Sequence, residues 1–371
     1  MITNKGRQII AKYVLGQAPS FASYIAAGCG PRPLLNSGSA SISPSKESLD
    51  FEMFRVPIIS RGFIKEGNVE KLVLKAEMPT DQRYLITELG VFPSESNSVA
   101  GQYDSKLMIT FAPTESWVYS DGQNASAVTY VNSPVDSQNN SASIDASTPD
   151  FLFINSDMNI FSNTNRADRY EAPRFLNRAL MVYANTASIN SSFATSASSR
   201  YIENSNILFN FGQNLPDDEI KLAFSLVSKT ANQSTNPDVR ILMEFYNNIS
   251  GSNNGVPKAI AKYTLPASTF ADSRYKVIPK KISEFEKEPN FSWANVNMVR
   301  IYVSTFAAGT NNISNDYYII YDGIRIDNLT AENPLYSLIG YNVVKNTEAE
   351  PIDKLENTNN YVEYRFGISV V

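Results

Sequence analysis

The chain has 371 residues and a formal net charge of −5, and this acidic balance argues against a nucleic-acid-binding protein, which usually carries a basic face. It contains no histidine and one cysteine, Cys29, which argues against a histidine-based triad or a zinc site and rules out an intrachain disulfide. No run of about 20 apolar residues occurs, so we expect no membrane span. We therefore expect a protein that is not an enzyme, in which Cys29 is a small buried residue.

Residues 1 to about 115 are predicted to form a small α+β domain. Residues 3 to 16 have the pattern of one short helix, which Thr3 can cap and Gly16 can end. Val, Ile, Phe and Tyr then recur in short runs with a polar and apolar alternation that is typical of half-buried strands. These strands are expected at 23–28, 51–56, 71–78, 86–92 and 106–111.

Residues 116 to 150 are rich in Ser and Asn and contain Pro134 and Pro149, which is typical of a linker or a long exposed loop. From 151 to 334, short apolar runs recur between turn-rich pieces, which predicts a larger antiparallel β-sandwich, jelly-roll-like in its strand rhythm. The fold class is therefore expected to be mainly β. The sandwich strands are expected at 151–154, 179–183, 206–211, 220–226, 240–246, 259–263, 274–278, 299–303, 317–321 and 322–327.

The end of the chain carries a strand pattern of its own. Residues 361–370 alternate strictly between polar and apolar types, about 30 residues beyond the predicted sandwich. We predict that this strand returns to the N-terminal domain and completes its sheet. Residues 335–371 would then belong to that domain and the sandwich would be an insertion, which is tolerated where domain termini lie close together.

Four segments, taken in order, resemble a module of tailed bacteriophages. They are residues 1–13 (MITNKGRQIIAKY), 23–30 (SYIAAGCG), 51–58 (FEMFRVPI) and 86–92 (ITELGVF). Their order is similar to the N-terminal attachment module of phage tail-collar, tail-fibre or baseplate proteins. The resemblance covers residues 1 to about 115, together with the C-terminal strand if that strand joins the domain.

This resemblance implies a docking domain that fixes the chain to the tail, baseplate or neck of a virion assembled in the host cytoplasm. The implied partners are other virion proteins and copies of the chain itself, because phage tails repeat their subunits by symmetry. The sandwich would project from the particle. Two alternatives remain open: an adhesin of the tail that binds a host receptor or surface glycan, and a capsid decoration protein.

The two tryptophans are candidates for different roles. Trp117 lies close to Tyr119 at the edge of the first predicted domain, and both residue types favour contact surfaces. We therefore predict that Trp117 and Tyr119 contact a partner or a glycan. Trp293 precedes a predicted strand and is expected to pack in the core.

Acidic residues give no strong sign of a catalytic or metal site. The densest runs are Asp217–Glu219, which looks like a turn, and Glu284, Glu286 and Glu288, which alternate as in a solvated segment. We expect neither run to supply the paired carboxylates of a glycosidase. Jelly-roll modules often hold a structural Ca²⁺, but the available ligands lack EF-hand-like spacing, so we expect no cofactor. Those available ligands are Asp157, Asn159, Asp168, Asp322 and Asp327.

Overall fold

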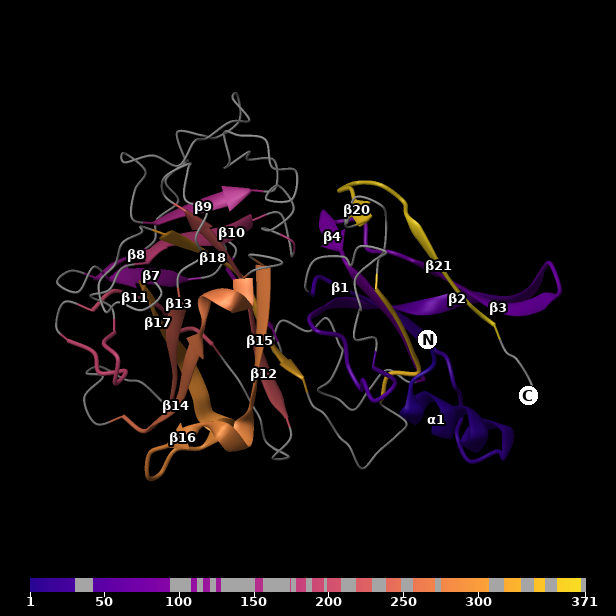
Figure 1. Ribbon diagram of the computed structural model, residues 1–371, viewed down its shortest axis with the longest axis horizontal. Coiled ribbons are helices and arrows are strands. Elements are labelled where there is room, and N and C mark those ends of the chain that lie inside the picture. Colours follow the sequence, from indigo (N-terminus) through magenta and orange to yellow (C-terminus); the bar gives the residue numbers. More distant parts are fainter. Residues whose placement is uncertain are drawn as a thin grey trace. The chain divides into compact units, whose positions relative to one another are not determined.

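The structure is a computed structural model of the chain, and it divides into two compact units that are described separately (Figure 1). Unit 1 comprises Met1–Leu107, Asp217–Glu219 and Arg325–Val371, and unit 2 comprises Met108–Pro216 and Ile220–Ile324. The residues described are 1–30, 43–93, 108–111, 116–120, 125–127, 151–155, 174, 178–184, 189–196, 199–207, 218–228, 238–247, 256–270, 275–306, 317–327, 337–343 and 352–367.

Unit 1 is built on a six-stranded antiparallel sheet. The C-terminal strand lies beside β3 (Val69–Glu77) in this sheet, in register from Tyr361 opposite Glu77 to Gly367 opposite Lys71. The predicted return of this strand to the N-terminal sheet is therefore confirmed, while 368–370 lie outside the described residues. The strand order is β19 (Gly340–Val343), β5 (Glu88–Phe92), β1 (Tyr24–Gly28), β2 (Glu52–Glu66), β3 (Val69–Glu77) and β21 (Tyr361–Gly367). A separate two-stranded pair joins β4 (Tyr84–Ile86) to β20 (Ile352–Lys354).

The predicted helix is confirmed as α1 (Asn4–Val14). The Thr3 hydroxyl accepts a hydrogen bond from the Gly6 N–H at 2.8 Å, which satisfies one of the free amides of the first turn. Gly16 follows the helix with a φ of +71°, a left-handed conformation that glycine adopts without strain. Of the apolar residues of the helix, Ile9 is fully buried, whereas Val14 is 76% exposed.

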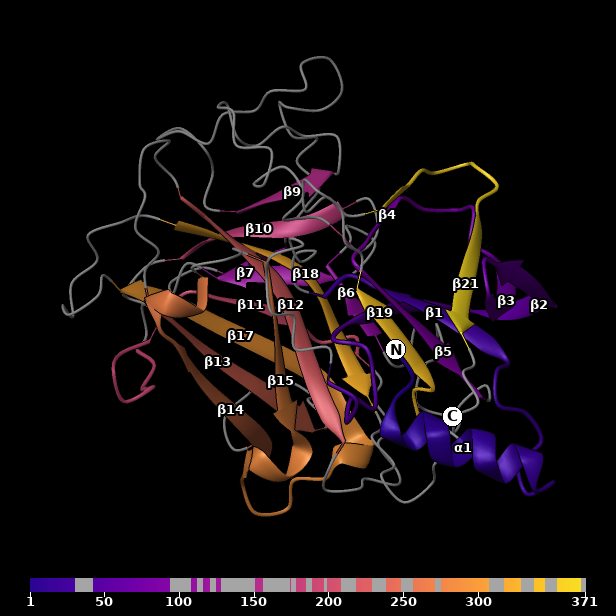
Figure 2. The same ribbon diagram turned by 45° about the vertical axis from the view of Figure 1, so that its right-hand side comes forward.

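Unit 2 confirms the predicted antiparallel β-sandwich (Figure 2). Phe111 stacks on Trp117 of the larger sheet at 4.5 Å and on Tyr321 of the smaller sheet at 5.1 Å, so one ring joins the two layers. The smaller sheet has the order β15 (Tyr275–Lys281), β12 (Glu219–Ser228), β18 (Tyr317–Asp327), β10 (Arg178–Ala184) and β9 (Phe151–Asn155), and β6 (Met108–Thr110) also pairs with β18. The larger sheet has the order β16 (Glu286–Lys287), β14 (Lys258–Leu265), β13 (Asp238–Asn247), β17 (Val296–Phe306), β11 (Tyr201–Asn204), β7 (Trp117–Ser120) and β8 (Ala125–Ala127).

The first boundary of the sandwich differs from the prediction. The strand expected at 106–111 in the N-terminal domain is β6, which pairs with β18 in unit 2. The region 116–150, expected as a linker or loop, contains β7 and β8, both in the larger sheet, while 121–124 and 128–150 lie outside the described residues. The short apolar alternation of β7 was obscured by the Ser- and Asn-rich sequence that follows it.

Two further strand predictions need correction. The strand expected at 206–211 does not include Asn206 or Ile207, and 208–211 lie outside the described residues. A strand is present just before it, at Tyr201–Asn204, where Ile202 and Asn204 are buried. The pieces 317–321 and 322–327 form one continuous strand, β18. Among the described residues, no helix has the length and apolar character needed to cross a bilayer.

Candidate functional site

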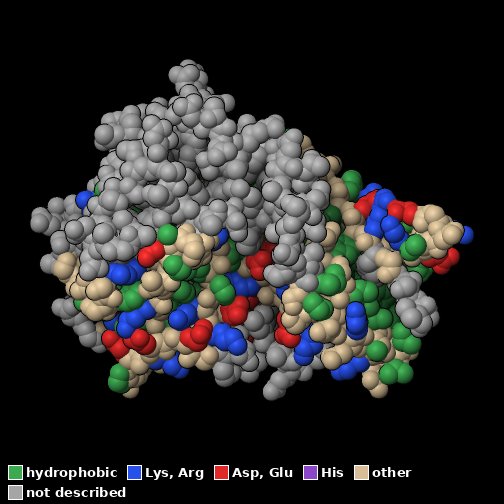
Figure 3. Space-filling model, in the orientation of Figure 1, with side chains coloured by type: hydrophobic (Ala, Val, Ile, Leu, Met, Phe, Trp, Pro, Cys, Tyr) green, Lys and Arg blue, Asp and Glu red, His purple; other side chains and the backbone are tan. Residues whose placement is uncertain are grey.

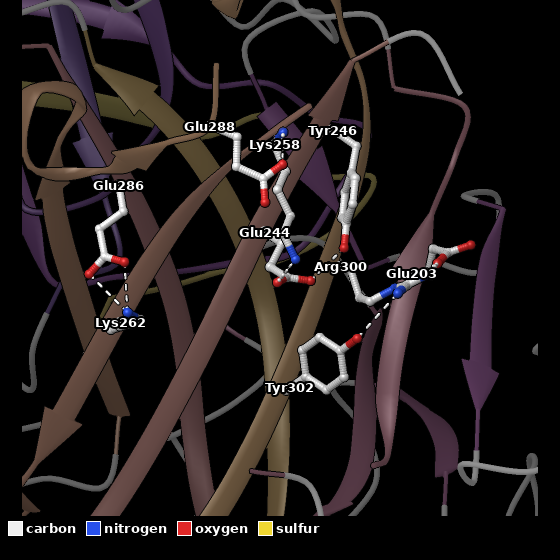
Figure 4. A network of polar contacts seen from close by, with 9 residues as sticks. All are labelled: Glu203, Glu244, Tyr246, Lys258, Lys262, Glu286, Glu288, Arg300 and Tyr302. Carbon is white, nitrogen blue, oxygen red and sulfur yellow. Dashed lines mark hydrogen bonds and ion pairs between the residues drawn. The ribbon is translucent and has the colours of Figure 1, made fainter. Parts of the chain in front are cut away.

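One face of the seven-stranded sheet carries charged and tyrosine side chains in place of an apolar row. On β13, Ile241, Met243 and Phe245 are fully buried in the sandwich interior, so the alternate residues Glu244 and Tyr246 lie on the opposite side. We call this side the polar face, and Figure 4 shows most of its side chains together. The polar face comprises Tyr201, Glu203, Glu244, Tyr246, Lys258, Lys262, Glu286, Glu288, Arg300 and Tyr302.

Arg300 is the centre of the polar face. It lies opposite Glu203 on β11 and opposite Glu244 on β13, so the pairing of three strands aligns the charges in one row. Its guanidinium donates to the Glu203 carboxylate at 2.8 Å and to the Tyr302 hydroxyl at 3.2 Å. Burial lowers the pKa of Arg300, but attraction to Tyr302 and Glu203 outweighs this effect, so the net pKa is raised. Arg300 therefore stays charged.

A second group of contacts lies around Glu244 (Figure 4). Its carboxylate accepts hydrogen bonds from the Tyr246 hydroxyl and the Lys258 ammonium, each at 2.6 Å. Burial and the neighbouring Glu244 charge both raise the pKa of Tyr246, so this phenol stays protonated as a donor. Farther along the sheet, Lys262 contacts both carboxylate oxygens of Glu286, at 2.7 and 2.9 Å.

Aromatic groups lie beside these charges. The Tyr201 ring is half-buried, with its centroid 5.3 Å from that of Tyr302 and 4.3 Å from the Arg300 guanidinium carbon. Burial raises the pKa of Tyr302 to about 12, although Arg300 acts in the opposite direction. Ile189 and Leu242 pack with Tyr302 into a small apolar cluster, against which Tyr201 also packs. The polar face thus joins an apolar patch to a row of hydrogen-bonding groups.

A fixed turn borders this patch. The Asn190 side-chain oxygen accepts hydrogen bonds from the backbone amides of Ser192 and Ala194 at 2.9 and 3.0 Å. Phe193 lies within this turn with a φ of 61°, which is uncommon for a bulky residue and which the surrounding hydrogen bonds hold in place. The Phe193 ring packs against the apolar cluster while remaining partly exposed.

The predicted contact residues Trp117 and Tyr119 do not lie on a surface. Trp117 is 2% exposed and Tyr119 is 3% exposed. The Trp117 indole donates to the Thr110 carbonyl at 3.0 Å, and the Tyr119 ring lies 4.8 Å from that of Phe151. The prediction that they contact a partner or glycan is therefore wrong, because alternate residues of β7 point into the sandwich core.

Other residues that the sequence predicts to be structural are buried in the core or bonded to the backbone. Trp293 is buried and packs edge-on against Phe285 and Phe291, which confirms the expected core position. Cys29 is buried, as expected. In the acidic run at 284–288, Glu284 accepts a hydrogen bond from the backbone amide of Lys281 at 3.0 Å. Asp218 is buried, and Asp217 lies outside the described residues.

The acidic residues considered for calcium are used for other contacts where they are described. Asp322 accepts hydrogen bonds from the Arg174 amide and the Tyr275 hydroxyl, and Asp327 pairs with Arg325. Within the ranges given above, no group of three or more acidic or cysteine side chains could hold a metal ion. Asp157, Asn159 and Asp168 lie outside those ranges.

Sequence reasoning missed most of the polar face. A signal was nevertheless present, because three strands carry a tyrosine and a charged residue two positions apart. Such a spacing places both side chains on the same side of a strand. The three pairs are Tyr201 with Glu203, Glu244 with Tyr246, and Arg300 with Tyr302.

The sequence matches no protein-family model and no curated protein sequence. Among solved structures, the chain is similar to a carbohydrate-binding module, CBM28, specific for non-crystalline cellulose, with 11% identity over 43% of this chain and 78% of that one (TM-score 0.28). The chain is also similar to a family 11 carbohydrate-binding module from Clostridium thermocellum, with 14% identity over 41% of this chain and 78% of that one (TM-score 0.25). A third similar structure is SGBP-B from a complex xyloglucan utilization locus in Bacteroides uniformis, with 9% identity over 83% of this chain and 92% of that one (TM-score 0.28). These low TM-scores carry no argument about function.

Proposed function

We propose that unit 2 binds a carbohydrate through the polar face of its seven-stranded sheet. The observation that carries this proposal is the position of Tyr201, a half-buried tyrosine next to the Glu203–Arg300 ion pair. Ligand sites commonly join an apolar or aromatic surface to a few precisely held polar groups. The C–H face of a sugar ring can pack on an aromatic ring while its hydroxyls bond to the neighbouring charged groups.

The charge arrangement favours a neutral ligand. Glu203 is paired with Arg300, Glu244 with Lys258, and Glu286 with Lys262, so carboxylates and cations offset one another along the sheet. On the described part of the sandwich face that Figure 3 shows, acidic and basic side chains lie next to one another, without a large area of one sign. A phosphate or a nucleic acid would need an excess of positive charge. Hydroxyl groups bond well to ionised side chains without needing a net charge.

The proposal is tested by affinity electrophoresis and calorimetry of the full chain. The probes are hydroxyethylcellulose, mixed-linkage β-glucan and xyloglucan, followed by an array of bacterial surface glycans. We expect at least one probe to bind, and we expect Tyr201→Ala to weaken binding by about tenfold or more, the effect of losing one aromatic contact.

The matched control is Tyr361→Ala, which removes a tyrosine that is 51% exposed on β21 of unit 1. This variant should bind like the wild type. Both tryptophans lie in unit 2, so an unchanged tryptophan emission spectrum shows that Tyr201→Ala leaves unit 2 folded. Absence of binding to every probe, or equal binding by Tyr201→Ala and wild type, would overturn the proposal.

We also propose, as a second function, that unit 1 attaches the chain to a phage virion. The observation that favours it is the way the resembling segments fit together. The Glu88 carboxylate accepts hydrogen bonds from the amides of Asp50 and Phe51, each at 2.9 Å. A Cβ atom on Gly28 would clash with the Glu88 carboxylate and with the Phe51 carbonyl, so the position of Glu88 requires a glycine at 28. The three strand motifs thus form one packed arrangement of β1, β2 and β5.

Virion attachment is tested on particles purified from a host that expresses the chain. We expect the protein to co-purify with particles through a density gradient, and we expect antibodies against unit 2 to label the tail, baseplate or neck in electron micrographs. Labelling of the head would support a capsid decoration protein instead. A protein present in the lysate and missing from the particles would contradict both.

A further inference from the structure

β21 is the last strand of the six-stranded sheet, and in the described parts of the chain it pairs only with β3. Its opposite edge carries backbone amide and carbonyl groups that can pair with another strand. The other end of the sheet differs, because Ile2 forms a bridge with Gly340 on β19 and Met1 exchanges hydrogen bonds with Tyr341. The N-terminus therefore covers the β19 edge, while β21 offers its edge to a partner.

Side chains on β21 alternate between buried and exposed. Val362 and Tyr364 are buried on the core side of the sheet, whereas Glu363 and Arg365 are exposed on the other side. The Arg365 guanidinium contacts the Glu363 carboxylate at 2.9 Å and the Glu66 carboxylate at 2.8 Å. The Glu363 and Arg365 side chains are 42% and 47% exposed, so both are accessible to a partner.

We propose that β21 pairs in antiparallel fashion with β21 of a second copy of this chain, about a two-fold axis at Tyr364. In such a pair, residues equally far before and after the centre lie opposite each other. Glu363 of each copy then faces Arg365 of the other, which gives two opposite-charge pairs on the exposed side. On the core side, Tyr364 faces its own symmetry mate. The interface is isologous, as in most homodimers.

The charges select both the register and the occupant. A two-fold axis at Glu363 or at Arg365 would place that charge opposite its own copy, and directly opposed like charges destabilise a sheet. Charged residues on an edge strand usually prevent edge pairing. Here a glutamate and an arginine lie at equal distances on either side of the centre, so the charges oppose a random strand and favour a second β21. The two sheets would then form one continuous sheet.

The test is sedimentation of the full chain over a range of concentrations and at low and high salt. We expect a concentration-dependent dimer in the wild type. Glu363→Arg alone and Arg365→Glu alone should each raise the dimer dissociation constant about tenfold or more, because each substitution creates two like-charge pairs. The double variant Glu363→Arg, Arg365→Glu should restore the dimer, since it exchanges the charges and recreates the pairing.

The matched control is Asp353→Arg, which changes the charge of an exposed ion-paired residue on β20 and should leave the dimer unchanged. Protection of the buried Cys29 thiol from labelling shows that unit 1 of each variant is folded. A wild type that stays monomeric would overturn the proposal. So would single variants that dimerise normally, or a double variant that remains as weak as the single ones. Glycan binding is unaffected by any of these outcomes.

Discussion

Charged side chains serve different purposes in the interior of unit 1 and on the polar face of unit 2. In unit 1, Glu88 and Arg325 are fully buried and bind backbone groups of neighbouring segments. On the polar face, pairs such as Lys262 and Glu286 lie across adjacent strands and remain partly exposed to water. The first arrangement fixes the path of the chain, and the second leaves some of its charged side chains in contact with water.

The interior of unit 1 contains an alternating chain of charges. The Arg55 guanidinium donates two hydrogen bonds to the Glu52 carboxylate, at 2.8 and 2.9 Å, and lies 3.6 Å from the Phe92 ring centre. Arg325 donates to the Asp327 carboxylate at 2.6 Å and to the Glu52 carbonyl at 3.0 Å. Burial lowers the pKa of Arg325, but attraction to Asp327 and Glu52 leads to a net increase.

This difference indicates that the loss of unfolding free energy on removing a charged side chain depends on whether its remaining partner is buried or exposed to water. Removing one partner of a buried pair leaves an uncompensated charge away from water, which is strongly destabilising. Removing one partner of an exposed pair leaves a charge that water solvates. The unfolding of each unit can be followed by itself. Cys29 is the only cysteine and lies in unit 1, so its labelling reports unit 1, while Trp117 and Trp293 both lie in unit 2, so tryptophan emission reports unit 2.

The largest expected effect is that of Arg325→Met. This change leaves Asp327 without the cation that it contacts at 2.6 Å, and we expect unit 1 to lose about 3–5 kcal/mol of unfolding free energy. The measurement is the denaturant dependence of Cys29 labelling. Arg325→Lys, which keeps the charge but loses the planar geometry, should recover part of the loss. A change below about 1 kcal/mol would mean that the buried charges do not stabilise unit 1.

The next largest effect is a pH dependence of the unfolding free energy of unit 1, caused by Glu88. Burial, followed by repulsion from Asp50, raises the pKa of Glu88 from 4.5 to about 7. The folded state therefore holds the proton more tightly than the unfolded state. The contribution of protonated Glu88 to the unfolding free energy is complete below pH 4.5 and is lost as the pH rises through about 7. The total contribution is on the order of 3 kcal/mol.

Glu88→Gln removes this titration. The unfolding free energy of unit 1, followed by Cys29 labelling with dithiodipyridine, should fall between pH 4.5 and 7 in the wild type and should fall less in the variant. Tryptophan emission reports unit 2 in the same samples and serves as the internal control. Equal pH dependence of wild type and variant would show that Glu88 is not the titrating group.

The smallest effect is expected for Lys262 and Glu286 on the polar face. Their side chains are 37% and 61% exposed, so a double-mutant cycle with Lys262→Met and Glu286→Gln should give a coupling energy of about 0.5 kcal/mol or less. The coupling, measured by tryptophan emission during denaturation, should decrease further in high salt. A coupling as large as that of the buried pairs would remove the distinction between the two regions.

The sequence alone determined the helix at Asn4–Val14, most of the strands and the return of β21 to the first sheet. The helix and the strands depend on local signals, namely a capping threonine, a left-handed glycine and the period of two that a half-buried strand imposes. The return of β21 was inferred instead from the distance of its strand pattern beyond the sandwich. The core position of Trp293 could be predicted for the same reason. Trp117 could not be placed correctly, because the core lining of β7 depends on Phe111 and Tyr321, which the fold brings from elsewhere.

The candidate site was decided by tertiary structure. The pairs Tyr201 with Glu203 and Arg300 with Tyr302 are visible in the sequence, but they lie almost 100 residues apart and meet only because β11 and β17 are neighbours. Likewise, Glu88 looks like an ordinary strand glutamate until the amides of Asp50 and Phe51 surround it. Local periodicity indicates which face a side chain is on, whereas strand order decides what it meets there, and strand order depends on long-range pairing that no short segment specifies.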